Sequence, residues 1–214
     1  MRKQSQWKRS VVVSAVAVVA AAWLGSIPAG AADVPKVGQP APNFTAKDLD
    51  GKSRSLSEFK GKYVVLEWHN QGCPFVRKHY ESGNMQKLQK ELTGKGAVWL
   101  SIISSAPGAQ GFVTPEQEKQ YLQEKQAAPT TVLFDPDGTV GHAYGAKTTP
   151  HMFVINDKGV IVYAGAIDDN PSSDAADAAT AKNFVRAAYE EASAGKPVST
   201  ASTAPYGCGV KYKN

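Results

Sequence analysis

Two apolar segments constrain the fold of this chain more than any other feature. Tyr63–Trp68 and Ala97–Ser104 are rich in large apolar residues, and Glu67 alone interrupts the first. Runs of this kind are typical of strands that are buried on both faces of a sheet. Residues from Pro74 to about Leu92 predict a helix between them, with a kink at Ser82–Asn84. A strand-helix-strand unit therefore lies at the centre of the fold.

The remaining elements extend this unit into an α/β fold. Asp50–Gly51 lies between residues 44–49 and 53–56 and predicts an N-terminal β-hairpin. Thr114-Pro115 starts a polar helix that should reach Gln126 on the surface. Residues 130–134, 152–155 and 160–164 predict further strands, and residues 177–194 the last helix. This order predicts a central mixed sheet with helices on both faces.

The first 31 residues have the pattern of a secretory signal peptide. Four basic residues within the first nine positions precede the apolar run Val11–Leu24, and Ala29-Gly30-Ala31 forms a small-residue cleavage site. The apolar run is shorter than the ~20 residues that a membrane-spanning helix needs. We expect cleavage after Ala31, a periplasmic or secreted protein, and no membrane attachment after cleavage.

Removal of this segment changes the charge balance. The whole chain has 24 Lys and Arg against 19 Asp and Glu, a net charge of +5, whereas residues 32–214 keep 20 basic residues against the same 19. A net charge of +1 is not the electrostatic pattern of a nucleic-acid-binding protein. Cys73 and Cys208 both lie in this part, and in an oxidising compartment they are either linked or chemically active.

Cys73 is the first candidate for a reactive group. It follows a buried strand and precedes Pro74, which puts it at the N-cap of the predicted helix. The helix dipole and unpaired N–H groups lower a thiol pKa there, and Arg77 adds positive charge one turn later. The alternative is an inert buried thiol. Thr149–Pro150, in a loop before a strand, is either a cis peptide that holds backbone against Cys73 or an ordinary turn.

Four other side chains around this segment are candidates for acid–base or metal chemistry. Glu67 in a buried strand must be neutral, hydrogen-bonded or functional, unless the strand end is exposed and the carboxylate solvated. His69, His79 and His151 with Cys73 would suit copper or zinc. His69 and His79 are ten residues apart, which is no metal-ligand spacing, so we predict no metal site. The histidines are then partners of a thiolate or ordinary surface residues.

Several motifs resemble the thioredoxin-like superfamily, and most closely its peroxiredoxin-like redoxin (AhpC/TSA-type) branch. They are Gly38–Phe44, Leu66–Val76, Asp135–Gly145, Lys147–Gly159 and Gly207–Lys211, and the resemblance covers roughly Val37–Lys211. It implies a thioredoxin-like fold over residues 32–197, followed by a tail, residues 198–214, that carries Cys208. It also implies that Cys73 is the redox-active thiol, that Pro150 is a cis-proline facing it, and that Glu67 is the buried acid beneath it.

The sequence departs from the patterns of this superfamily at the reactive segment. Thioredoxins carry two cysteines separated by two residues, and here either Val76 replaces the second or Asn70 replaces the first. Asn70 also stands where peroxiredoxins carry Thr or Ser, and Leu66 where they carry Pro. The chain therefore has no adjacent dithiol, and its peroxidase motif is incomplete.

These observations predict an exported thiol-based oxidoreductase that uses no cofactor. Glu67 would move protons while the Cys73 thiolate attacks a protein disulfide or a peroxide, and an unknown thiol would supply electrons. Candidate substrate-binding residues surround the thiol in sequence or in the inferred fold: Asn70, Pro74, Arg77, Thr149 and Pro150. The alternatives are a copper-binding chaperone that uses Cys73 and His151, and a non-catalytic thioredoxin-fold binding module.

Cys208 is the candidate partner that would resolve an oxidised Cys73. The two residues are 135 positions apart, but the entropic cost of closing a loop grows only with the logarithm of its length. A disulfide requires their Cα atoms to come within about 7 Å. The alternatives are an intermolecular disulfide and a free Cys208 thiol.

Overall fold

A computed structural model describes Met1 and residues 34–213 of the chain. The signal peptide predicted for residues 1–31, with its cleavage site, lies outside the described residues apart from Met1. Among the helices that the structure does describe, none has both the length and the apolar character required to cross a bilayer.

Three parallel strands form the centre of a seven-stranded sheet. They are β3 (Val64–Trp68), β4 (Val98–Ile103) and β5 (Thr131–Phe134). Every residue of β3 and β4 is buried, which explains their continuous apolar character. The strand order is β2-β1-β5-β4-β3-β7-β8, with the antiparallel strands at its edges: β1 (Thr45–Asp48), β2 (Ser53–Ser55), β7 (His151–Ile155) and β8 (Ile161–Gly165). The mixed sheet and the N-terminal hairpin are thus confirmed.

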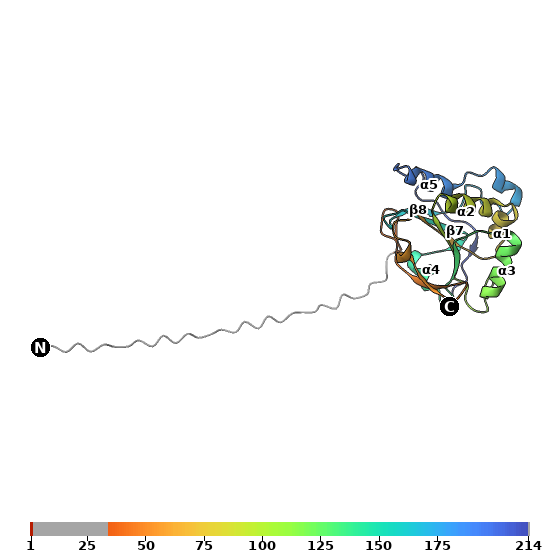
Figure 1. The fold of residues 1–214 in the computed structure, drawn as a ribbon. Helices are drawn as coiled ribbons and strands as arrows, with labels where there is room; N and C mark the ends of the chain where they lie inside the picture. The colour runs from red at the N-terminus through yellow and green to blue at the C-terminus, as the bar shows by residue number, and fades with distance from the viewer. Residues whose placement is uncertain (2–33, 214) are drawn as a thin grey trace. The chain divides into compact units, whose positions relative to one another are not determined.

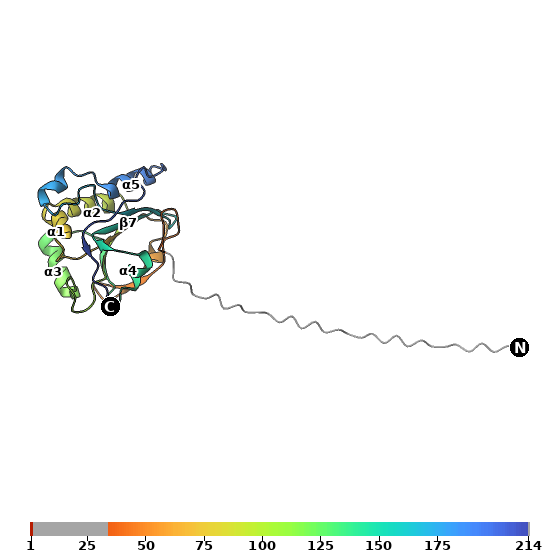
Figure 2. The same cartoon turned by 180° about the vertical axis from the view of Figure 1, so that it is seen from behind.

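Helices cover both faces of this sheet. One face packs against α1 (Pro74–Glu81), α2 (Asn84–Gly94) and α5 (Phe184–Ser193), with Tyr121 of α3 (Pro115–Lys125) in the same cluster. The other face packs against α4 (Thr139–Tyr144) and the 3-10 helix η1 (Leu56–Phe59). Both views show α2 and α5 on one side of β7 and α4 on the other (Figure 1; Figure 2). The predicted α/β architecture with two helical layers is confirmed.

Two of the predicted helices have different bounds in the structure. The helix expected over residues 74–92 is two helices, because Gly83 adopts a left-handed conformation with φ of 75° and separates α1 from α2. The last helix does not begin at Asp177. A 3-10 helix, Ala175–Ala179, ends first, and α5 starts after Asn183, whose side chain accepts a hydrogen bond from the Arg186 N–H at 2.8 Å.

The tail after Pro197 contains strand β9 (Cys208–Gly209). It pairs with β6 (Thr148–Thr149) in a second, two-stranded sheet, with Thr149 opposite Cys208. Thr203 also accepts a hydrogen bond from the Ala166 N–H at 2.9 Å. Backbone pairing, which composition does not reveal, therefore fixes this segment against the sheet.

Candidate active site

Cys73 caps the N-terminus of α1, as the sequence predicted. Its backbone is extended, with φ of −83° and ψ of 125°, and its carbonyl accepts hydrogen bonds from the N–H groups of Val76 and Arg77. The side chain is fully buried, and its Sγ lies 3.1 Å from the carbonyl oxygen of Thr149. Thr149–Pro150 is a cis peptide, as the resemblance implied. The loop before β7 therefore faces the thiol directly.

The tail strand brings Cys208 to the same place. Because Thr149 pairs with Cys208, the residue that contacts the Cys73 thiol also positions the second cysteine. Gly207 permits this approach: its φ is 130°, and a Cβ atom there would overlap the carbonyl oxygen of Thr149. Both cysteines are free thiols in this structure, and Cys208 is partly exposed.

The surroundings distinguish the two thiols. Burial alone would raise the pKa of Cys73, but hydrogen bonds from the thiol and backbone N–H of Cys208 and from the N–H of Val76 stabilise the thiolate, and the pKa falls below its ordinary value. Burial, together with the hydrogen bond to Cys73, raises the pKa of Cys208 to about 11. Cys73 is therefore the more readily ionised of the two thiols.

The loop before Cys73 is built around Asn70. The buried Asn70 side chain accepts a hydrogen bond from the Gly72 N–H at 2.9 Å and donates to the Gln110 side chain at 3.1 Å. The backbone carbonyl of Asn70 accepts a hydrogen bond from the Cys73 N–H at 3.0 Å. Asn70 thus shapes the turn that presents the thiol, in contact with Gln110, which the sequence did not indicate.

Pro74 and Arg77, two other predicted site residues, lie on the first turn of α1. Pro74 occupies the first helical position, where its missing N–H costs no hydrogen bond. Both side chains are exposed. The hydrogen bonds that lower the pKa of Cys73 come from backbone groups and from Cys208, rather than from the Arg77 guanidinium that the sequence suggested.

Glu67 is fully buried, and its carboxylate is hydrogen-bonded rather than solvated. It accepts from the hydroxyl of Tyr80 at 2.9 Å, the indole of Trp99 at 2.8 Å and the hydroxyl of Ser101 at 2.8 Å. Burial raises its pKa, but the adjacent His69 and these donors outweigh burial, and the net shift is downward. Glu67 is therefore an ionised carboxylate whose nearest titratable cation is His69.

A second buried polar cluster holds the tail, and the sequence did not reveal it. Tyr206, two residues before Cys208, donates a hydrogen bond to Asp168. Lys78 Nζ lies 3.6 Å from the other oxygen of Asp168 and 5.6 Å from the centre of the Tyr206 ring. The Nε2 atom of His79 lies 3.3 Å from the Tyr206 hydroxyl. We call Lys78, His79, Asp168 and Tyr206 the tail anchor.

The histidines do not surround Cys73 as a metal site would. Among residues 34–213, no group of three or more His, Cys, Asp or Glu side chains is arranged to hold a metal ion. His79 belongs to the tail anchor. His151 accepts a hydrogen bond from the Lys147 N–H at 3.3 Å, and burial lowers its pKa to about 4.

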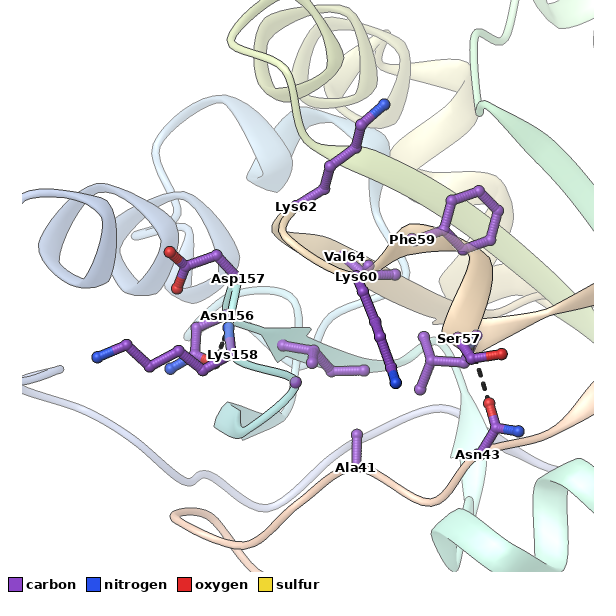
Figure 3. Close-up of a pocket in the computed structure, with 13 residues that line it drawn as sticks. Ala41, Asn43, Ser57, Phe59, Lys60, Lys62, Val64, Asn156, Asp157 and Lys158 are labelled. Atoms are coloured by element: carbon purple, nitrogen blue, oxygen red, sulfur yellow. Dashed lines mark hydrogen bonds between the residues drawn. The ribbon is translucent and has the colours of Figure 1, made fainter.

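A pocket of about 350 Å³ lies at the opposite end of β3 from Cys73 (Figure 3). Lysines 60, 62 and 158 surround it, and the Ser57 N–H donates to the Asn43 side chain at 3.0 Å on one side. The described residues that line it include no cysteine or histidine. None of the site residues predicted from the sequence lines this pocket.

The AhpC/TSA family matches residues 37–164, more than half of the chain. The chain belongs to the AhpC/TSA family. Membership confirms the resemblance inferred from the motifs around Cys73 and Pro150. The matched region ends before the tail, so the position of Cys208 comes from the structure rather than from the family.

Curated relatives of this AhpC/TSA protein include both disulfide and peroxide enzymes. The thioredoxin-like protein YneN of Bacillus subtilis is 32% identical over 58% of this chain and 68% of its own length. The thiol-disulfide oxidoreductase ResA of Halalkalibacterium halodurans is 28% identical over 59% of this chain and 66% of its own length. The peroxiredoxin bcp of Coxiella burnetii is 30% identical over 58% of this chain and 76% of its own length. The chain is accordingly an oxidoreductase of the thiol-dependent class.

Solved structures extend the likeness of the AhpC/TSA protein to nearly the whole described fold. A hypothetical protein of Sinorhizobium meliloti 1021 has a TM-score of 0.70 and 26% identity, over 83% of this chain and 95% of that one. An uncharacterised protein of Geobacillus kaustophilus has a TM-score of 0.69 and 25% identity, over 85% and 94%. The thioredoxin Etrx1 of Streptococcus pneumoniae has a TM-score of 0.50 and 23% identity, over 70% of this chain and 99% of that one, and its match confirms the thioredoxin-like fold class.

Proposed function

We propose that this protein is an exported thiol oxidoreductase in which Cys73 is the nucleophile and Cys208 resolves the oxidised Cys73. One observation carries the proposal: Thr149 contacts the Cys73 sulfur at 3.1 Å and pairs with Cys208 in β9. A single residue thus aligns two thiols that lie 135 positions apart. The pair takes the place of the adjacent dithiol that the chain lacks.

In the first step the Cys73 thiolate attacks an oxidant. With a disulfide R–S–S–R′, a Cys73–S–SR bond forms, the S–S bond of the substrate breaks, and R′S⁻ leaves. With hydrogen peroxide, an S–O bond forms, the O–O bond breaks, and Cys73 becomes a sulfenic acid while hydroxide leaves. In both cases Cys73 is oxidised and the substrate is reduced.

In the second step Cys208 displaces the group bound to Cys73. Its thiol loses a proton, the sulfur attacks Sγ of Cys73, and the Cys73–Cys208 disulfide forms with release of RS⁻ or water. The lowered pKa of Cys73 and the raised pKa of Cys208 support this order, since Cys73 ionises at a lower pH than Cys208 does. An external thiol would then reduce the disulfide and complete the cycle.

The burial of Cys73 favours a small oxidant over a folded protein disulfide. Strand β9 covers the thiol and already pairs with Thr149, so a polypeptide substrate would have to displace it. We expect hydrogen peroxide to oxidise the reduced protein faster than a protein disulfide does. Stopped-flow measurement of thiol loss with each oxidant tests this choice, and faster reaction with the protein disulfide would reverse it.

Trapping experiments test the two roles directly. In Cys208→Ser the sulfenic acid at Cys73 should persist long enough to be trapped by dimedone, whereas Cys73→Ser should consume no peroxide beyond the rate of a free cysteine. Equal reactivity of both variants would contradict the assignment. A non-catalytic binding module, by contrast, predicts that Cys73 titrates near pH 8.5 as a free thiol does.

Export is part of the proposal and rests on the pattern of residues 1–31. An oxidising compartment would permit the Cys73–Cys208 disulfide to persist between catalytic cycles. N-terminal sequencing of the protein from a cell-envelope or secreted fraction should begin at Ala32. A protein that begins at Met1 would refute cleavage.

A further inference from the structure

Helix α3 carries a buried carboxylate that the catalytic scheme above does not use. Glu118 is fully buried, although the polar sequence of its helix predicted a surface position. Neither of its carboxylate oxygens has a hydrogen-bond partner among the described residues. A buried carboxylate without hydrogen-bond donors is strongly unfavourable unless a nearby positive charge compensates it. The compensating group is therefore the feature to identify.

His69 is the group that faces Glu118. Its Nε2 atom lies 3.5 Å from Glu118, and its Nδ1 atom lies 3.5 Å from Glu67. The imidazole is packed between the rings of Tyr80 and Tyr121, whose centres lie 5.1 and 5.4 Å away. His69 is itself almost fully buried. A ring with one carboxylate at each nitrogen has the surroundings of an imidazolium, which donates from both nitrogens.

The groups packed around His69 favour its protonated form. Burial lowers its pKa, but Glu118, Glu67 and Cys73 together raise it above the ordinary value. Burial and the Glu67 carboxylate raise the pKa of Glu118 and His69 lowers it, with a net upward shift. Tyr80 and Tyr121 face the cluster as neutral phenols, and Glu81 and Arg77 act on Tyr121 with opposite signs. The effect of Cys73 on His69 is mutual, because coupling between two titrating groups acts on both.

We propose that Glu118 is a positioning residue for charge at the active site: it holds His69 as an imidazolium, and this cation stabilises the Cys73 thiolate. The inference rests on the proposed role of Cys73 as the nucleophile. His69 is four residues before Cys73 and belongs to the segment that links β3 to α1. Glu118 therefore acts on the thiol through His69 and not by contact with the substrate.

The direction in which the pKa of Cys73 changes when Glu118 is removed separates this mechanism from direct repulsion between two negative charges. Glu118 as an isolated negative charge would disfavour the thiolate, so its removal would lower the pKa of Cys73. Glu118 acting through His69 gives the opposite result, since its removal discharges the imidazolium and raises the pKa of Cys73. A merely structural role for Glu118 would leave the pKa unchanged in the folded protein.

Ultraviolet absorbance of the thiolate against pH tests the proposal and suits a thiol that is buried from alkylating reagents. In Glu118→Gln we expect the pKa of Cys73 to rise by about one unit, which is about a tenfold fall in thiolate fraction below that pKa. The matched control is Glu124→Gln, an exposed glutamate on the same helix, which should leave the titration unchanged. In His69→Asn the rise should also appear, and adding Glu118→Gln to it should produce no further rise.

An unchanged or lowered pKa of Cys73 in a folded Glu118→Gln protein would overturn the proposal. If wild-type Cys73 itself titrates as an ordinary thiol, the proposed function fails first, and the two failures are thus distinguishable. Should Glu118→Gln not fold, NMR titration of the His69 ring in the wild-type reduced protein gives the answer. A ring protonated at neutral pH supports the proposal, and one that titrates below about 6.5 contradicts it.

Discussion

The two cysteines belong to regions that are held in place by different means. Cys73 lies between β3 and α1, where the sheet and three helices form a continuous apolar cluster. Cys208 lies on a partly exposed tail that is held by a two-residue strand pair, by the tail anchor around Asp168, and by packing of Tyr206 and Cys208 against the edge of that cluster. Cys73 is therefore fixed by fully buried strands and helices, and Cys208 by a partly exposed strand at their edge.

This difference has a chemical consequence. A disulfide cycle needs a nucleophile whose surroundings do not change and a partner that can move as the S–S bond forms and breaks. Regions held by few contacts open at lower free energy than the core does. Changes in the core should therefore reduce global stability without changing the exchange chemistry, and changes in the tail should do the reverse.

The largest expected effect on stability comes from the Cys73 side of the comparison. Leu88 on α2 is fully buried in the apolar cluster, and Leu88→Ala should reduce the free energy of unfolding by about 2–5 kcal/mol. Lys87→Ala, at the exposed neighbouring position, should change the free energy of unfolding by about 0.5 kcal/mol or less. Urea unfolding measures both. A loss below about 1 kcal/mol for Leu88→Ala would show that this region is held no more firmly than the tail.

Gly207→Ala should produce the largest effect on the tail. The left-handed backbone costs about 1–3 kcal/mol for alanine, and its Cβ would also overlap the Thr149 carbonyl. We expect formation of the Cys73–Cys208 disulfide to slow by at least about tenfold, with little change in the urea midpoint. Gly209→Ala is the control, since its Cβ would meet nothing nearer than 3.9 Å. Equal rates in the two variants would mean that β9 pairing does not position Cys208.

The tail anchor predicts an intermediate effect. Tyr206→Phe removes a hydroxyl that donates a hydrogen bond to buried Asp168 and leaves that carboxylate oxygen with the Asn170 N–H as its remaining donor, at a cost of about 1–3 kcal/mol. Disulfide formation should slow, and the pKa of Cys73 should rise as Cys208 moves away. Tyr189→Phe, which removes a hydroxyl bonded to Lys95 far from the tail, should do neither. Rapid-quench mass spectrometry measures the rate of disulfide formation, and thiolate absorbance against pH measures the pKa of Cys73.

Acid should weaken the same anchor, an effect that is absent at neutral pH and grows only as the pH falls below about 6.5. Burial lowers the pKa of His79 to about 4, consistent with a neutral ring that accepts from Asn84 at Nδ1 and faces Tyr206 with Nε2. The unfolded state binds a proton below about pH 6.5 and the folded state only near pH 4, so stability falls between these values, by up to about 3 kcal/mol. In His79→Gln the fall in the free energy of unfolding between about pH 6.5 and pH 4 that is due to His79 should disappear. An unchanged pH profile of unfolding would contradict the lowered pKa.

The sequence predicts the Cys73 side of the comparison far better than the tail side. Strands β3 and β4 follow from unbroken apolar runs, and the N-cap of α1 follows from Cys73-Pro74, because these signals are local. Thr149–Pro150 was recognisable from its motif. These features could be located because each depends on residues that are neighbours in the sequence.

The polar clusters were not predictable from the same signals. Glu118 and Lys78 lie in helices whose charged residues indicate solvent exposure, and only partners distant in sequence, His69 and Asp168, account for their burial. Strand β9 has two residues, too few for a periodic pattern, and depends on Gly207 to approach Thr149. Long-range electrostatic and backbone pairing carries no signature in a single sequence.

One measurement tests the central claim most directly. Reduced protein, treated with less than one equivalent of hydrogen peroxide and digested without reductant, is analysed by mass spectrometry at low protein concentration. The account predicts a Cys73–Cys208 peptide derived from one chain, confirmed by mixing light and heavy isotope-labelled protein, in which no mixed-mass pair should appear. A sulfinic Cys73 beside a free Cys208 thiol, or a mixed-mass disulfide, would contradict it.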